Sequence, residues 1–108
     1  MSTDVMDFLV KSGGGALHEL FARVSSRPQT IVKSLRVYSD KGLVRLKGPR
    51  TLKDLEKLIT DLRGKNGYDS ETIEEQRQAV AAEIVEHQRG FMSTFVHPTA
   101  KAITLSLR

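Results

Sequence analysis

The chain has 108 residues, of which 39% are hydrophobic and 28% are charged, and its formal net charge is +4. This balance predicts one soluble globular domain and argues against a disordered tail or a membrane-spanning segment. Because there is no cysteine, disulfides, zinc–thiolate sites and thiol nucleophiles are excluded. The N-terminal residues Met-Ser-Thr-Asp lack the apolar core of a secretion signal, which predicts a cytoplasmic location.

The positive charge is concentrated in one part of the chain. From Arg23 to Arg50 there are eight basic residues and one acid, Asp40, whereas Thr51 to Arg89 carries six basic and nine acidic residues. This asymmetry predicts a half that binds a polyanion, joined to a half with another role. A solvated charged surface is the other interpretation of the same charges.

The first half of the chain predicts three short helices and a strand. The first helix stops at the glycines 13–15, which we expect to form a flexible connection. The second helix covers residues 17–24, where apolar residues recur on one face. The third covers 27–41 and ends at Gly42, a residue type that favours a helix C-terminus. Alternating apolar and polar residues at 43–47 predict a half-buried strand.

The second half predicts two longer helices and a last strand. Leucines at heptad spacing indicate a helix over 52–62, the glycine-containing segment 64–67 breaks it, and a further helix follows over 69–90. We expect these helices to form an antiparallel helical hairpin. Alternation over 102–107 predicts a strand. The apolar seam of the two helices consists of Leu52, Leu55, Ile59, Leu62, Ile73, Val80 and Ile84.

This seam is too short to form a stable free coiled coil, so it must pack on something else. It either belongs to the core of the monomer or forms an interface with a second copy. We favour the dimer interface, because the acidic character of this half sets it apart.

The segment from Leu17 to Val44 carries a more specific pattern. Leu20 is followed ten residues later by Thr30-Ile31, and the helix that starts there ends in Lys41-Gly42-Leu43-Val44. This pattern resembles the winged helix-turn-helix superfamily of DNA-binding domains, over residues 5–47, with the second wing strand expected at 102–108. The resemblance implies a mainly helical α+β fold with a small β wing, followed or interrupted by the helical hairpin.

The resemblance also implies that the helix 27–41 enters the major groove of DNA. That groove is about 12 Å wide and admits one α-helix. Polar side chains of the helix would contact base edges, and basic residues around it would contact phosphates. The expected DNA-binding residues are Arg27, Gln29, Thr30, Lys33, Ser34, Arg36, Arg45, Lys47 and Arg50.

We therefore expect one compact domain with three parts: a winged helix-turn-helix core at 1–50, a helical hairpin for dimerisation or partner binding at 51–90, and a strand that completes the wing at 91–108. The predicted function is that of a small dimeric transcription regulator that binds double-stranded DNA. The three histidines lie far apart and no catalytic arrangement is visible. We expect no enzymatic activity, no cofactor, no metal and no membrane contact, and the sequence identifies no effector.

Two alternatives remain open at this point. Val32 and Val37 are apolar at positions of the third helix that would face DNA. They favour a winged helix that binds or assembles with another protein and does not bind DNA, since a fold does not fix a function. The chain also stops on the predicted last strand, so a further alternative is that it is part of a longer protein.

Overall fold

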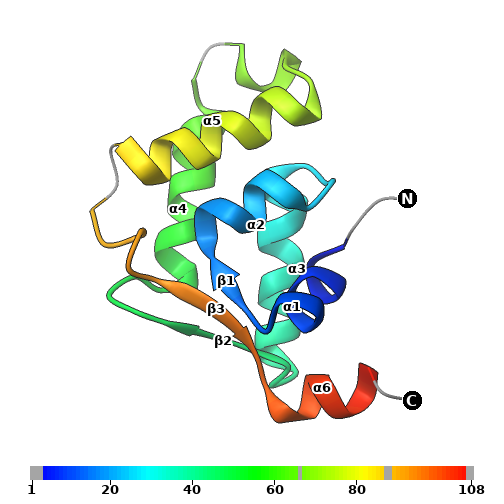
Figure 1. Cartoon of the computed structure of the whole chain (residues 1–108). Coiled ribbons are helices and arrows are strands. Elements are labelled where there is room, and N and C mark those ends of the chain that lie inside the picture. Colours follow the sequence, from blue (N-terminus) through cyan, green and yellow to red (C-terminus); the bar gives the residue numbers. More distant parts are fainter. Residues whose placement is uncertain (1–3, 66, 87–88, 107–108) are drawn as a thin grey trace.

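The computed structural model describes residues 4–65, 67–86 and 89–106 (Figure 1). Among these residues the sheet is small and most of the chain is helical, which confirms the predicted α+β class. The helices are α1 (Val5–Ser12), α2 (Leu17–Arg23), α3 (Pro28–Asp40), α4 (Leu52–Arg63), α5 (Ile73–Glu86) and α6 (Ala100–Ser106), with a 3-10 turn η1 (Tyr68–Ser70) before α5. The strands are β1 (Gly15–Ala16), β2 (Val44–Lys47) and β3 (Phe95–Pro98).

The three strands form one antiparallel sheet in the order β1–β3–β2. In the pairing of β2 with β3, Arg45 lies opposite His97 and Lys47 lies opposite Phe95. Between these two paired strands the chain makes α4, η1 and α5. The helical segment therefore interrupts a pair of antiparallel strands, as expected, although the second strand of the pair is not the predicted one.

The strand predicted at 102–107 is wrong. Residues 100–106 form α6, and Leu107 lies outside the described residues. The reason is local, because Thr99 provides a helix start: its hydroxyl accepts from the amide of Ala102 at 3.4 Å, and its carbonyl accepts from the amide of Ile103 at 3.1 Å. A threonine in this position is a good helix N-cap. The apolar alternation that indicated a strand is compatible with this short helix.

The glycines 13–15 do not form the flexible connection that we expected. Gly13 ends α1 in the left-handed conformation, and Gly15 begins β1. Gly14 has a φ of +117°, and a Cβ atom there would lie 2.6 Å from Nδ1 of His97 and 2.8 Å from the carbonyl oxygen of Val96. Only glycine permits this close approach, so the glycines bring β1 against β3.

One hydrophobic core joins all three predicted parts of the chain. Six of the seven seam residues are buried within the single chain, and Ile73 is 39% exposed. For the six buried residues the core interpretation is confirmed and the dimer interface that we favoured is wrong, because α2 and α3 already cover them. The buried members are Leu52, Leu55, Ile59, Leu62, Val80 and Ile84.

The helices α4 and α5 do not form the predicted antiparallel hairpin. Helix α4 packs beside α3, whereas α5 packs on α2, and the two helices run in crossing directions in Figure 1. The turn between them is fixed by Tyr68, which is 3% exposed, and α5 begins at Ile73 and not near residue 69. Each helix therefore directs its apolar residues to a different partner.

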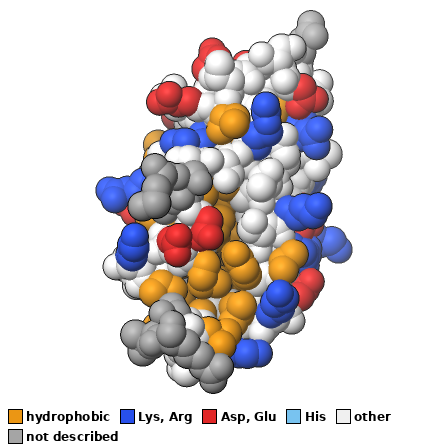
Figure 2. All heavy atoms as spheres, turned by 90° about the vertical axis from the view of Figure 1, so that its right-hand side faces the viewer, with side chains coloured by type: hydrophobic (Ala, Val, Ile, Leu, Met, Phe, Trp, Pro, Cys, Tyr) orange, Lys and Arg blue, Asp and Glu red, His pale blue; other side chains and the backbone are white. Residues whose placement is uncertain are grey.

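No helix in the described part of the chain combines the length and apolar character that crossing a bilayer requires. Most large hydrophobic side chains are in the core. Figure 2 shows a further group of them on the surface, on the side of the molecule where α1, α3 and α6 lie.

Candidate nucleic-acid interface

Helix α3 is held by one face and exposes another. Pro28 stands at the start of the helix, where its missing N–H costs nothing. Ile31 and Leu35 are fully buried, which fixes this face of the helix in the core. Thr30 and Lys33 lie on the other side and are exposed. The helix thus presents a polar stripe on a rigid support.

Helix α5 fixes the turn between α2 and α3. The Arg77 guanidinium donates from Nε to the carbonyl of Phe21 at 3.0 Å and from Nη2 to the carbonyl of Ala22 at 2.7 Å. These are carbonyl groups at the end of α2, which have no partner within the helix. From the start of α3, Arg27 donates from Nη1 to Oε1 of Gln76 at 3.3 Å. The side chain of Arg27, which we expected to contact phosphate, is therefore engaged with α5.

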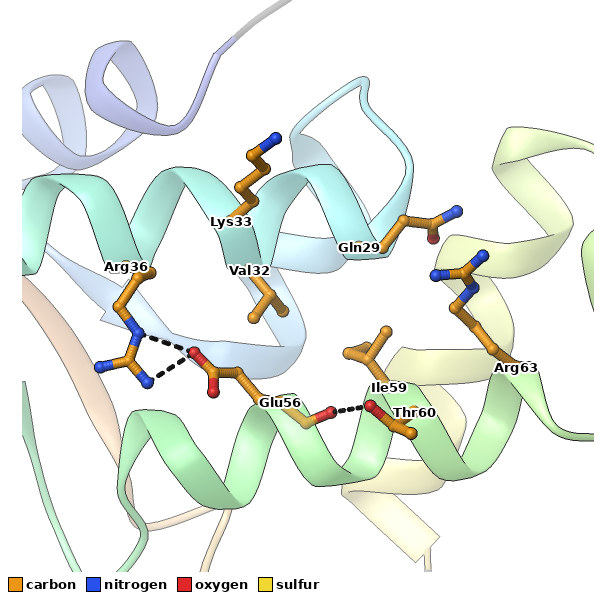
Figure 3. Close-up of a pocket in the computed structure, with 8 residues that line it drawn as sticks. All are labelled: Gln29, Val32, Lys33, Arg36, Glu56, Ile59, Thr60 and Arg63. Atoms are coloured by element: carbon orange, nitrogen blue, oxygen red, sulfur yellow. Dashed lines mark hydrogen bonds and ion pairs between the residues drawn. The ribbon is translucent and has the colours of Figure 1, made fainter.

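A groove of about 290 Å³ runs between α3 and α4 (Figure 3). Val32 and Ile59 point toward each other and form its apolar floor, and Val32 is only 6% exposed. One of the two valines that seemed to face outward is therefore covered by α4. Polar and charged side chains form the rims: Gln29, Lys33 and Arg36 from α3, and Glu56, Thr60 and Arg63 from α4.

The two cations that α3 contributes to the groove differ in whether they have an acidic partner. At one end Arg36 pairs with Glu56, whose Oε1 accepts from Nε at 2.8 Å and lies 2.7 Å from Nη2. The pair is largely exposed, so it contributes little stability, but it neutralises Arg36. Lys33 has no acidic partner within ion-pair distance among the described residues. Lys33 is therefore the cation of α3 that is most available to an anion.

Gln29 lies at the other end of the groove, near Arg63 (Figure 3). Its Oε1 atom is buried and has no hydrogen-bond partner among the described residues. An unpaired buried acceptor is unfavourable, so the side-chain amide of Gln29 gains a hydrogen bond if it turns toward a donor. Arg63 itself reaches Asp69 only at 3.4 Å in an exposed pair.

The remaining residues that we predicted to bind DNA differ in how exposed their side chains are. Arg45 and Lys47 are exposed on β2, whereas Ser34 is half-buried on α3. Arg50 is directed inward: its Nε donates to the carbonyl of Arg89 at 2.8 Å and its guanidinium lies 5.2 Å from the centre of the Phe91 ring. Arg50 is half-buried and closes the base of the insertion, and these contacts would compete with a contact to phosphate.

Helix α4 contributes to this site, which was not predicted. We assigned this helix to a hairpin, but it lies beside α3 and adds its own cations to the same side of the molecule. Lys53 and Lys57 are exposed on α4, one turn apart. Their spacing on the polar face of an amphipathic helix was visible in the sequence, but only the packing of α4 on α3 relates them to the site.

We compared the chain with models of protein families, with curated proteins and with solved structures, and none of these comparisons found a match.

Proposed function

We propose that this protein is a cytoplasmic winged helix-turn-helix domain that binds double-stranded DNA through α3 and acts as a small dimeric regulator of transcription. The connectivity supports this proposal, since two helices joined by a short turn precede an antiparallel strand pair. This is the arrangement that the resemblance in the sequence implies. The observation that carries the proposal is the exposed polar stripe of α3, which is anchored to the core on its other side.

In the proposed complex the first two turns of α3 face the base edges. A lysine such as Lys33 can donate to O6 and N7 of guanine. The side-chain amide of Gln29 can pair with adenine once it turns outward, since its Oε1 atom is buried in the free protein. Thr30 fits either a base edge or a phosphate.

Helix α4 extends this interface. Because α4 lies beside α3, a phosphate backbone next to the bound groove would follow α4. Lys53, Lys57 and Arg63 are exposed along that helix and are the expected phosphate contacts. Such contacts fix orientation and affinity but carry no sequence information. We therefore add α4 to the phosphate-binding role that we first assigned to Arg27 and Arg50.

A salt titration of duplex binding tests the proposal. If about six phosphates are neutralised, the logarithm of the affinity falls with the logarithm of the salt concentration at a slope near −5. The variant carrying Lys33→Ala and Arg36→Ala should lose about 1–3 kcal/mol of binding free energy per lost base contact. Lys11→Ala removes one positive charge from an exposed position on α1 and should leave affinity nearly unchanged. Unchanged affinity in the double variant, or no binding near 50 mM salt, would contradict the proposal.

The alternative function is binding to another protein without DNA. Two observations favour it: Val37 is 41% exposed on α3, and Glu56 neutralises Arg36. The α3–α4 face would then meet an acidic protein surface. The same titration separates the two functions, because this alternative predicts no duplex binding even at low salt.

A further inference from the structure

A second hollow, of about 440 Å³, lies where α1, the end of α3 and α6 meet. We call the surface around it the α1–α6 face. One of its lining residues is Leu105 of α6, a large apolar side chain that is 46% exposed. Hydrophobic side chains gather on this side of the molecule in Figure 2. The apolar residues that line the hollow are Met6, Tyr38, Leu43, Ala102 and Leu105.

The α1–α6 face differs from most of a protein surface in that its apolar side chains lie together. Single exposed apolar residues are common and need no explanation. Here the apolar side chains come from separate helices and line one concavity. Contiguous apolar patches with a polar rim are typical of protein interaction sites. The α1–α6 face is therefore a candidate for covering by a partner.

The charges at its rim indicate which partner fits. Asp4 and Asp7, at the start of α1, line one edge of the hollow. At another edge the Lys101 ammonium donates to the carbonyl of Lys41 at 3.2 Å, next to the lining residues of α6 and of the α3–β2 turn. A rim with both signs is complementary to a rotated copy of itself, because a two-fold axis brings the acidic edge of one copy to the basic edge of the other.

Tyr38 connects this rim to the apolar centre. Burial raises the pKa of Tyr38, and the carboxylates of Asp4 and Asp7 raise it further. The phenol therefore stays protonated at neutral pH and keeps a donor at the border between apolar and acidic residues. Such a tyrosine, with an apolar ring and a polar tip, suits a protein interface.

We propose that the α1–α6 face binds a second copy of this chain in a two-fold dimer, with Leu105 and Tyr38 at its centre and Asp7 facing Lys101 across the axis. This inference deepens the proposed function and rests on the dimer included there. It assigns the dimer to α1, α3 and α6, and not to α4 and α5. Thr30 lies about 12 Å along α3 from Tyr38, at about 1.5 Å per residue. The DNA-facing end of α3 thus stays free in the dimer.

Light scattering coupled to gel filtration tests the interface. The wild-type protein at about 100 μM, well above the dissociation constant of a weak micromolar dimer, should have twice the chain mass of 12.0 kDa. Leu105→Glu should raise the dissociation constant at least about tenfold, since it puts a charge in the interface centre. The control is Val85→Glu on α5, where the side chain is 51% exposed, and it should leave the dimer intact. A monomeric wild type, or equal effects of both variants, would overturn the inference.

Charge reversal tests the two-fold geometry without changing the apolar centre. In the two-fold dimer Asp7 of each copy faces Lys101 of the other. Asp7→Lys and Lys101→Glu should therefore each weaken the dimer, because each change brings like charges together at both of these contacts. The protein that carries both changes should regain most of the lost affinity. If the double variant is weaker than either single variant, Asp7 and Lys101 do not face each other and the proposed arrangement is wrong.

The outcomes separate this inference from the proposed function. A monomeric wild type that binds duplex DNA would overturn the interface alone. A dimer that dissociates with Leu105→Glu but binds no duplex would overturn the DNA proposal alone. Where both hold, Leu105→Glu should bind a single half-site and lose the tighter binding to a two-fold site. Circular dichroism of each variant confirms that α6 and the remaining helices are folded.

Discussion

Helices α4 and α5 belong to the same insertion between β2 and β3, yet they are held to the rest of the protein in different ways. Helix α4 is attached by a continuous apolar stripe, in which Leu55 is fully buried and Ile59 is 4% exposed. Helix α5 buries Val80 and Ile84, but it also buries Gln76 completely. Its Arg77 adds hydrogen bonds to the main chain of α2. Hydrophobic burial thus positions α4, whereas directed polar contacts complete the positioning of α5.

The different attachments of α4 and α5 have different consequences for the candidate interface. The apolar stripe holds α4 against α3 and leaves its polar face for the candidate interface. The polar contacts of α5 reach the turn between α2 and α3, through Arg27 and through the end of α2. One inserted helix therefore adds charges beside α3, and the other fixes the direction in which α3 projects.

The largest expected effect concerns the apolar attachment of α4. Leu55→Ala should lower the free energy of unfolding by about 2–5 kcal/mol, because it removes a fully buried side chain and leaves a cavity. Lys57→Ala, on the exposed side of the same helix, should change it by less than about 0.5 kcal/mol. Urea denaturation followed by circular dichroism measures both. Equal, small effects would mean that α4 is not part of the core.

The next effect concerns the polar attachment of α5. The Gln76 amide donates to the carbonyl of Tyr68 at 2.9 Å and its oxygen accepts from Arg27. Gln76→Ala should cost about 1–3 kcal/mol, since it leaves a buried carbonyl without its donor. Gln78→Ala removes the same side chain from an exposed position two residues later. If both variants unfold at the same urea concentration, directed hydrogen bonds do not hold α5.

A smaller effect should appear in DNA binding. Glu56→Gln removes the carboxylate that neutralises Arg36 and should strengthen duplex binding, with a salt slope steeper by about one unit. Asp61→Asn removes the same charge from an exposed position on α4. It should increase affinity less, because it releases no cation of α3. Anisotropy titrations at several salt concentrations compare the two variants, and identical slopes would exclude a direct role for Arg36.

The sequence predicts those elements of the fold that are determined by their own residues, and it misses those that are determined by contacts with distant parts of the chain. The segment 52–62 was predicted as a helix and forms α4 at Leu52–Arg63, because its heptad leucines make a strong local pattern. Strand β3 was missed, since Phe95–Pro98 is short and is a strand only through pairing with β2. The glycines 13–15 were misjudged for the same reason, because their use becomes apparent only when His97 lies against them.

The candidate site shows the same limit. The exposure of Thr30 and Lys33 follows from helical spacing and was predicted. The partners of three arginines could not be predicted, because they are distant in sequence. Arg27 meets a side chain 49 residues away, Arg36 one 20 residues away, and Arg50 a carbonyl 39 residues away. Charge counting identifies a basic segment, but only the packing shows which of its cations are available.

The smallest expected effect is one that the two inserted helices share. Both begin with a capping box, in which the backbone amides of Thr51 and Thr72 donate to Asp54 and Glu75. These hydrogen bonds lower the pKa of both carboxyl groups below their usual range. A lowered pKa in the folded state means that the stabilisation is complete above the pKa of the unfolded chain and is lost as the pH falls through the folded value.

Acid titration of stability tests this shared feature. The free energy of unfolding should decline as the pH falls below about 4, the ordinary range of carboxyl groups. The variant carrying Asp54→Asn and Glu75→Gln should show a shallower decline. If its decline equals that of the wild type, other carboxylates cause the acid sensitivity.

The insertion also sets the order of events when the chain is made. Its two ends meet at Gly48, where a Cβ atom would lie 2.5 Å from Cα of Thr94, and the adjacent amide of Arg50 bonds to Thr94 across 44 residues. At about 5–20 residues per second, β2 leaves the ribosome several seconds before β3 exists. During that interval its edge is open to pairing with other chains, and charged side chains on an edge oppose such pairing. Because β2 is an outer strand of the finished sheet as well, we expect its exposed residues Arg45 and Lys47 to oppose such pairing both during synthesis and after folding.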